Sequence, residues 1–230
     1  MKATDRARGR TAAPTGRATL TIAVVLTTVL LSGCGGGGES SPPTTTSAKP
    51  TARASGLRGL VPTPLPRKAD FTLTDARGHR FDFVSATKGK LTYLYFGYTH
   101  CPDVCPLTMA NISAALRREP VAVRRKVAVI FVTVDPRRDT RPVLRAWLRR
   151  YGPSFVGLTG SRRQIGIAER LSGVPLAAPE QTNGGGYAVQ HSAIVLAYSP
   201  DNRAHVVYAE GFTSADYAHD MPILQRFRAS

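Results

Sequence analysis

Hydrophobic and polar residues alternate with the periods of strands and helices in the chain downstream of a low-complexity N-terminal part. Residues 71–74 and 80–83 predict a β-hairpin whose turn lies at residues 76–78. Largely apolar runs at residues 91–96 and 127–134 predict two further strands, and the second run is typical of a strand buried on both faces.

A helix is predicted between those two apolar strands, because Met109, Ile112 and Leu116 recur at helical spacing. A strand, a helix and a second strand in this order imply a right-handed crossover, and therefore a parallel pair of strands.

The hydrophobic pattern of the rest of the chain predicts further helices and strands. Gly152 and Pro153 end one helix, and Ser161 with Gln164 forms a plausible capping box that opens the next. The predicted elements are helices at about 140–150, 161–171 and 214–227, and strands at 189–198 and 204–209. The glycine-rich residues 173–186 are predicted to form a mobile loop. The fold class is therefore α/β, with a central mixed sheet flanked by helices and an N-terminal β-hairpin.

The first 33 residues have the pattern of a signal peptide. Residues 1–19 are basic, and the apolar run at residues 20–31 is too short to cross a bilayer as a helix. The run ends in Leu-Ser-Gly-Cys, which resembles the lipobox of bacterial lipoproteins, so Cys34 is expected to carry lipid. We expect the chain to be anchored at the extracytoplasmic face of the cell membrane.

Residues 34–66 are rich in Gly, Ser, Pro and Thr and poor in large apolar side chains. Such a composition does not repay the entropy of folding, so this segment is predicted to be a flexible tether with a reach of roughly 30 Å. Residues 67–230 are then the folded domain.

The net charge of the chain excludes few classes of function. The chain has 31 Lys and Arg against 15 Asp and Glu, a net charge of +16, which suits nucleic acid, anionic lipid or an acidic partner. Arg141, Arg145 and Arg149 lie four residues apart on one side of a predicted helix, which indicates a solvated face. No basic stretch is interleaved with aromatic residues, so nucleic-acid binding is not expected.

Two of the three cysteines remain for chemistry once Cys34 is assigned to lipid. A disulfide between Cys101 and Cys105 would close a loop of about three residues and would constrain the unfolded chain very little. Both cysteines lie where a predicted strand gives way to a helix, and a helix N-terminus favours thiolate over thiol. At this spacing the two sulfurs can share a disulfide bond or one metal ion.

The cysteine segment at residues 96–106 resembles the signature of Sco/SenC-type copper chaperones. The resemblance continues at residues 134–140 and 187–192, and the three motifs occur in the family's order over about residues 67–220. It implies a thioredoxin-like fold that binds copper through Cys101, Cys105 and His191.

The resemblance also implies a role and partners. The expected function is delivery of copper, as Cu(I) and also Cu(II), to the copper-binding subunit of cytochrome c oxidase, with a periplasmic-type protein as copper donor. Thiolates select Cu(I), and imidazole suits either oxidation state. Asp103 and Asp135 are candidate outer-shell residues. The sequence departs from the family at Gln190, where Asp usually precedes the histidine.

Other interpretations stay open from the sequence. A thiol:disulfide oxidoreductase on the same fold would use Cys101 and Cys105, although a redox thioredoxin normally has Cys-X-X-Cys and a cis-proline where His191-Ser192 stands. A third hypothesis is a tethered binding module with a static disulfide.

The remaining polar candidates have simpler interpretations. His100 adjoins the first cysteine and is the nearest competitor of His191. Asp103 is either a turn residue or a modulator of metal transfer, and Asp139 is predicted to cap the helix that follows it. The histidines expected at the surface are His79, His205 and His219.

Overall fold

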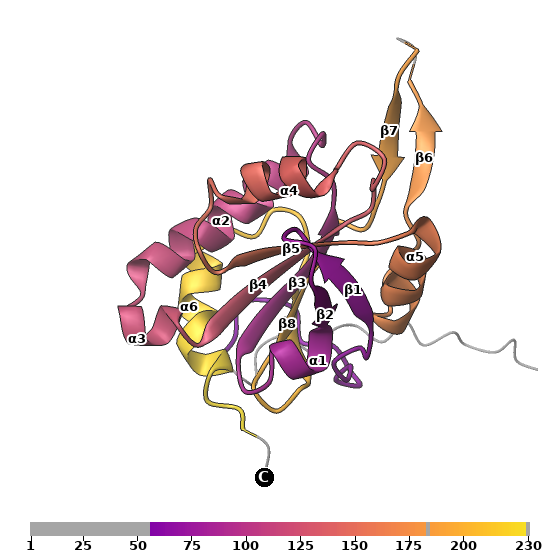
Figure 1. Cartoon of the computed structure of the whole chain (residues 1–230). Helices are drawn as coiled ribbons and strands as arrows, with labels where there is room; N and C mark the ends of the chain where they lie inside the picture. Colours follow the sequence, from indigo (N-terminus) through magenta and orange to yellow (C-terminus); the bar gives the residue numbers. More distant parts are fainter. Residues whose placement is uncertain (1–55, 183–184, 229–230) are drawn as a thin grey trace, which may run out of the picture. The chain divides into compact units, whose positions relative to one another are not determined.

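Seven strands form one mixed sheet in the computed structural model, which describes residues 56–182 and 185–228 (Figure 1). Their order across the sheet is β2-β1-β5-β4-β3-β8-β9. The bounds are Thr72–Asp75 (β1), Arg80–Asp82 (β2), Leu91–Gly97 (β3), Val127–Thr133 (β4), Phe155–Thr159 (β5), Val195–Tyr198 (β8) and Ala204–Tyr208 (β9). The predicted hairpin is confirmed as the antiparallel pair β1 and β2, and the predicted parallel pair as β3 and β4.

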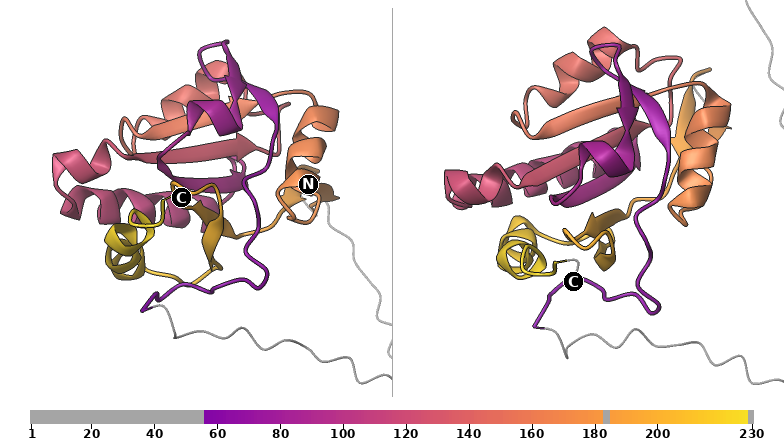
Figure 2. Two further views of the ribbon diagram at one scale, coloured as in Figure 1. Left: turned by 90° about the horizontal axis from the view of Figure 1, so that it is seen from below. Right: turned by 60° about the horizontal axis from the view of Figure 1, so that its bottom comes forward.

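Helices cover both faces of this sheet, which confirms the predicted fold class. Their bounds are Phe83–Ala86 (α1), Val104–Arg118 (α2), Val121–Arg124 (α3), Arg141–Leu148 (α4), Arg162–Leu171 (α5) and Ser214–Leu224 (α6). Figures 1 and 2 show α2, α4 and α6 on one face and α1 and α5 on the other. Within the described residues, none of these helices has the length and apolar character needed to cross a membrane.

The predicted details of two helices are confirmed. Ser161 and Gln164 form the capping box that opens α5. On α4 the apolar side chains Leu144, Trp147 and Leu148 are buried against the sheet. The arginines of the opposite face are exposed, as expected for a solvated surface.

Strand β5 was not predicted from the sequence. It pairs in parallel with β4 and antiparallel with β1, so it completes the sheet between them. Gly157 lies in its middle, where an added Cβ would come within 2.6 Å of Leu144 and 2.7 Å of Leu148. The glycine that lets α4 pack directly on the strand also interrupts the apolar pattern by which strands are predicted.

The single strand predicted at residues 189–198 is wrong. The chain forms β7 (Tyr187–Gln190), leaves the extended pairing at residues 191–194, and resumes as β8. Strand β7 pairs with β6 (Ala178–Gln181) in a separate two-stranded ribbon, whereas β8 pairs with β3. The pairing partner therefore changes from β6 to β3 within the predicted strand. The side chains on both sides of the break are typical of strands, so the hydrophobic pattern gave no signal of it. The loop predicted at 173–186 is also wrong in part, because it contains β6.

The folded unit begins earlier than the predicted boundary at residue 67. Leu57 is buried, and the backbone N–H groups of Arg58 and Gly59 donate to the buried carboxylate of Asp220 at 2.8 and 2.9 Å. Leu60 then pairs with Val207 of β9. The end of the predicted tether is thus held by backbone hydrogen bonds that its composition does not reveal. The predicted signal peptide, Cys34 and the tether up to residue 55 lie outside the described residues.

Candidate metal centre

The two cysteines lie at the junction between β3 and α2. The N–H of Cys101 donates to the carbonyl of Tyr98 at 3.3 Å, which turns the chain away from the strand. Asp103 then begins α2 as its N-cap residue, with its carboxylate accepting from the N–H of Val104. Cys105 stands in the first helical turn, and its N–H donates to Sγ of Cys101 at 3.4 Å. The helix N-terminus therefore faces the first sulfur.

The ring of His191, which is distant from the cysteines in the sequence, lies beside the two sulfurs. Its Nε2 lies 3.4 Å from Sγ of Cys105, and the ligand atoms of Cys101, Cys105 and His191 all lie within 4.8 Å of one another. The predicted convergence of these three side chains is confirmed. Nδ1 lies 3.2 Å from the carbonyl oxygen of Ser192, an acceptor that favours the tautomer with its lone pair on Nε2.

Two tyrosine rings hold the imidazole in this orientation. His191 packs edge-to-face against Tyr95 and Tyr98, with ring centroids 6.0 and 5.5 Å apart. The hydroxyl of Tyr95 also donates to Sγ of Cys105 at 3.6 Å. Neither tyrosine was singled out in the sequence, although both belong to the aromatic run that precedes the cysteines.

The two thiols have opposite electrostatic environments. The pKa of Cys101 is lowered to about 4, first because the thiol of Cys105 donates to it, with the N–H of Cys105 as a further donor. Burial raises the pKa of Cys105, which has no exposed surface, and the neighbouring sulfur raises it further. These opposite shifts favour thiolate character at Cys101 and retention of a proton by the more deeply buried Cys105.

This donor set fits a soft metal ion. Two sulfurs and one imidazole nitrogen converge without a carboxylate among them, which favours Cu(I) or Zn²⁺ over hard cations. In a three-coordinate site, metal bonds of about 2.0–2.3 Å place the donor atoms about 3.5–4.0 Å apart. The site therefore needs only a slight contraction to bind a metal.

Gly97 makes room for the buried sulfur. A Cβ at this position would lie 2.8 Å from Sγ of Cys105 and 2.7 Å from the ring of Tyr95. Only a hydrogen atom fits there. This residue was missed in the sequence, where a glycine at the end of a strand reads as a simple terminator.

Asp139 does not cap the helix that follows it, so that prediction is wrong. The N-cap residue of α4 is Thr140, and the fully buried carboxylate of Asp139 turns inward instead. It accepts from the N–H and hydroxyl of Thr99 at 2.9 and 2.6 Å, and from the hydroxyl of Thr133 at 2.6 Å. Asp139 therefore ties the cysteine loop to the end of β4.

The side chain of His100 belongs to this hydrogen-bond network and not to the metal cluster. Its Nδ1 lies 3.1 Å from the hydroxyl of Thr99 and 3.5 Å from the carboxylate of Asp139. The competing imidazole is therefore held away from the two sulfurs.

Asp135 positions the strand that leads to His191. Its buried carboxylate accepts from the hydroxyl of Tyr187 at 2.9 Å and from Nε of Arg138. Arg138 also donates to the carbonyl of Tyr187 at 2.9 Å and lies 3.9 Å from the centre of its ring. These contacts, which we call the Tyr187 latch, fix β7 four residues before the histidine. They place Asp135 outside the donor set.

The other sequence candidates lie apart from the cluster. Gln190 is exposed and donates to Glu180 at 3.0 Å, so it joins β7 to β6. His79 is at the surface as predicted. The prediction for His205 is wrong, because its ring stacks on Phe227 at 3.8 Å and pairs with Asp201. His219 is exposed, as predicted, and lies 2.9 Å from the carboxylate of Asp220.

Comparisons with known proteins agree with this arrangement. The SCO1/SenC family model matches residues 63–224. Protein sco1 of Schizosaccharomyces pombe is 34% identical over 153 residues, which are 64% of this chain and 57% of that protein. The chain spans about half the length of the curated relatives it matches.

Two solved structures give the same fold with a metal in it. Copper-bound ScoI of Bradyrhizobium japonicum is 33% identical, with a TM-score of 0.61 over 68% of this chain and 98% of that one. Copper-bound ScoI of Arabidopsis thaliana is 27% identical, with a TM-score of 0.62 over 70% of this chain and 99% of that one.

Proposed function

The chain belongs to the SCO1/SenC family, and from this premise we propose that it binds one copper ion through Cys101, Cys105 and His191 and delivers it for assembly of cytochrome c oxidase. The observation that carries the proposal is the convergence of two sulfurs and one imidazole nitrogen within 4.8 Å. Copper in the two ScoI relatives supports the choice of metal.

The chemistry of the donors supports Cu(I) as the main cargo. Thiolate is a soft donor that selects Cu(I), and a neutral imidazole completes a three-coordinate site. Two thiolates, one imidazole and Cu(I) carry a net charge of −1. The same imidazole also suits Cu(II), so the site can hold the ion in either oxidation state.

Proton release tests the charge state of the thiols. With the pKa of Cys101 lowered and that of Cys105 raised, binding of Cu(I) at pH 7 is expected to release about one proton per metal ion. The number should rise as the pH falls through about 4, because Cys101 is then also protonated before metal arrives. The measurement is pH-stat titration with Cu(I) supplied in acetonitrile. Release of two protons at pH 7 would contradict the assigned thiolate.

The Tyr187 latch gives a second, smaller prediction. Tyr187→Phe removes one hydrogen bond to a buried carboxylate and is expected to lower the free energy of unfolding by about 1–2 kcal/mol. It should also weaken Cu(I) binding by up to about tenfold, as outer-shell changes do.

The matched control for this change is Tyr151→Phe. The Tyr151 ring packs on Trp147, and within the described residues its hydroxyl makes no hydrogen bond to a metal ligand, so loss of this hydroxyl should leave Cu(I) affinity unchanged. Competition with a chromophoric chelator measures both variants. Equal affinities in the two would show that the latch does not position His191.

The proposed location is the extracytoplasmic face of the cell membrane, with lipid on Cys34. The support is the apolar run of residues 20–31 and the Leu-Ser-Gly-Cys sequence that ends it. Cys34→Ala is expected to block processing or release the protein from the membrane fraction. Normal processing with full membrane retention would exclude this anchor.

The proposed recipient is the copper-binding subunit of cytochrome c oxidase, and the family resemblance supports it. A deletion strain grown at limiting copper should contain oxidase with reduced copper content. The wild-type gene should restore it. Normal copper content in the deletion strain would refute delivery.

A second candidate function is reduction of the oxidase cysteines, and the thiolate of Cys101 favours it. That thiolate would attack a disulfide of the target, and Cys105 would then resolve the mixed disulfide, so that the target gains two thiols and this chain gains one disulfide. His191→Ala separates the two functions, because it keeps both thiols and removes a copper ligand. Full restoration of oxidase by this variant would favour reduction over delivery.

A further inference from the structure

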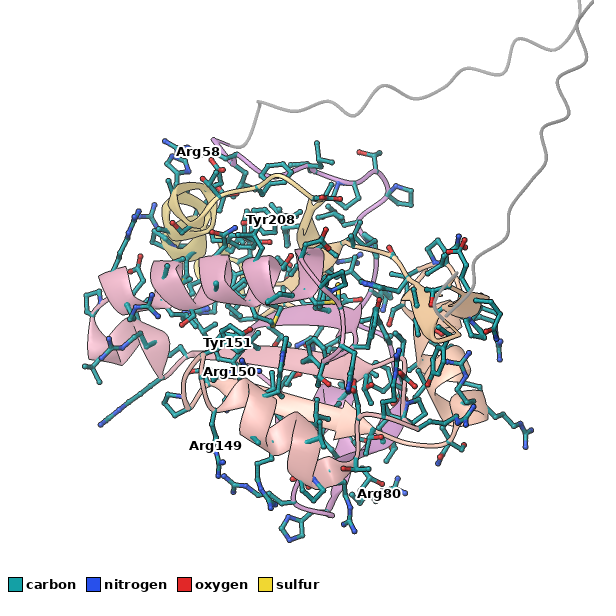
Figure 3. All side chains as sticks on the ribbon, turned by 90° about the horizontal axis from the view of Figure 1, so that it is seen from above. Arg58, Arg80, Arg149, Arg150, Tyr151 and Tyr208 are labelled. Atoms are coloured by element: carbon teal, nitrogen blue, oxygen red, sulfur yellow. The ribbon has the colours of Figure 1, made fainter. Side chains whose placement is uncertain are left out.

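A basic cleft of about 550 Å³ opens at the end of the molecule formed by the last turn of α2, by α3 and by the connection from α4 to β5. Five of its thirteen lining residues are arginines, whereas Lys and Arg make up 31 of the 230 residues of the chain. They are Arg117, Arg124, Arg125, Arg149 and Arg150. None of the described residues that line the cleft is acidic. Figure 3 shows Arg149, Arg150 and Tyr151 beside one another, apart from Arg58 and Arg80.

The positive charge of this cleft is not neutralised within the part of the chain that the structure describes. Every ion pair there involves other residues. Arg117 donates to the hydroxyl of Ser113, and Arg150 donates to the carbonyl of Trp147, but both acceptors are neutral. Guanidinium groups that line one cleft repel one another, and an anion bound between them reduces that repulsion.

The cleft also has an apolar part. Leu116 and Phe155 are buried side chains of its lining, and the ring of Tyr151 lies 5.7 Å from that of Phe155. Val121 at its edge is 51% exposed. An inorganic anion would leave this apolar surface unused, whereas a ligand that joins a phosphate to a glycerol ester would cover it.

We propose that this cleft binds the headgroup phosphate of an anionic membrane phospholipid. Arginine is suited to phosphate because its planar guanidinium donates two parallel hydrogen bonds. A cleft of this volume accepts one headgroup, and the acyl chains stay in the bilayer. Neighbouring Arg118 and Lys126, which do not line the cleft, add further positive charge toward an anionic surface.

The position of the cleft gives the proposal a consequence for the metal centre. The cleft includes the last turns of α2, while Cys105 lies in its first turn. A helix of 15 residues is about 22 Å long. A domain seated on the membrane through the cleft would therefore present its metal centre away from the bilayer. Lipid binding does not depend on copper, so the two proposals fail separately.

Trp147 provides an internal probe, because it is the only tryptophan and contacts both Tyr151 and Arg150. The experiment uses the full chain in a neutral detergent and follows tryptophan fluorescence on addition of dihexanoyl phosphatidylglycerol. Saturable binding is expected, with none for dihexanoyl phosphatidylcholine and at least tenfold weaker binding for glycerol phosphate. Arg124→Ala with Arg149→Ala should weaken binding of phosphatidylglycerol at least tenfold.

The matched control is Arg80→Ala with Arg163→Ala, which removes the same charge from exposed positions outside the cleft. It should bind phosphatidylglycerol as the unchanged protein does. Equal loss in the two double variants would show unspecific attraction to charge and overturn the proposal. Equal binding of glycerol phosphate and phosphatidylglycerol would assign the cleft to a soluble phosphate ligand instead, and no binding of either would remove the site.

Discussion

Replacing Cys105 by serine is expected to weaken Cu(I) binding by more than about a hundredfold. Loss of an outer-shell partner costs up to about a hundredfold, and Cys105 is itself a ligand in the proposed site. The change replaces a soft sulfur donor by a hard hydroxyl, and Cu(I) gains little from oxygen. Sγ of Cys105 also lies 3.4 Å from Nε2 of His191, so the change removes a donor that contacts the imidazole. The measurement is titration of the reduced protein against a chromophoric Cu(I) chelator.

His100→Ala is the control for that titration. This imidazole adjoins Cys101 in the sequence but is held by Thr99, so the variant should bind Cu(I) as the unchanged protein does. Full affinity in Cys105→Ser, or a large loss in His100→Ala, would mean that the donor set differs from the three convergent side chains.

Asp139→Ala is expected to lower the free energy of unfolding by about 3 kcal/mol or more, the second large effect. Its carboxylate is fully buried and accepts three hydrogen bonds, two from Thr99 and one from Thr133. Alanine leaves these donors buried without a partner, at about 1–3 kcal/mol each, with partial relief where water enters. Urea denaturation followed by tryptophan fluorescence measures the loss.

Asp75→Ala provides the comparison for Asp139. Asp75 also accepts backbone hydrogen bonds, from Arg77 and His79, but in an exposed turn where water replaces the lost acceptor. Its loss should cost about 1 kcal/mol. If both variants lost the same stability, burial of the Asp139 network would not be what holds the cysteine loop to β4.

The three ligands were predicted from the sequence because family motifs contain them. The structure shows why the spacing of these residues alone could not predict that they meet. Cys101 and Cys105 are joined by one turn of backbone, so their proximity is local. His191 reaches them only because the chain leaves the strand pairing between β7 and β8, and that break has no signature in the side-chain pattern.

The supporting residues were harder to predict because each acts through a partner far away in the sequence. Asp139 was assigned to a helix cap, which is a local role, while its actual partner Thr99 lies 40 residues earlier. Gly97 matters only because Cys105 and Tyr95 crowd its Cα. Composition likewise placed the tether's end at residue 66, although Asp220 holds the backbone of residues 58 and 59. Local sequence patterns predict helices and strands well. They miss contacts in which the second residue lies in a different part of the chain.

X-ray absorption at the copper edge, on the protein loaded with one equivalent of Cu(I), tests the central claim most directly. The account predicts two sulfur neighbours and one imidazole nitrogen in the unchanged protein, and two sulfurs without the imidazole in His191→Ala. An identical spectrum for the two proteins, or fewer than two sulfur neighbours in the unchanged one, would contradict a copper site made of Cys101, Cys105 and His191.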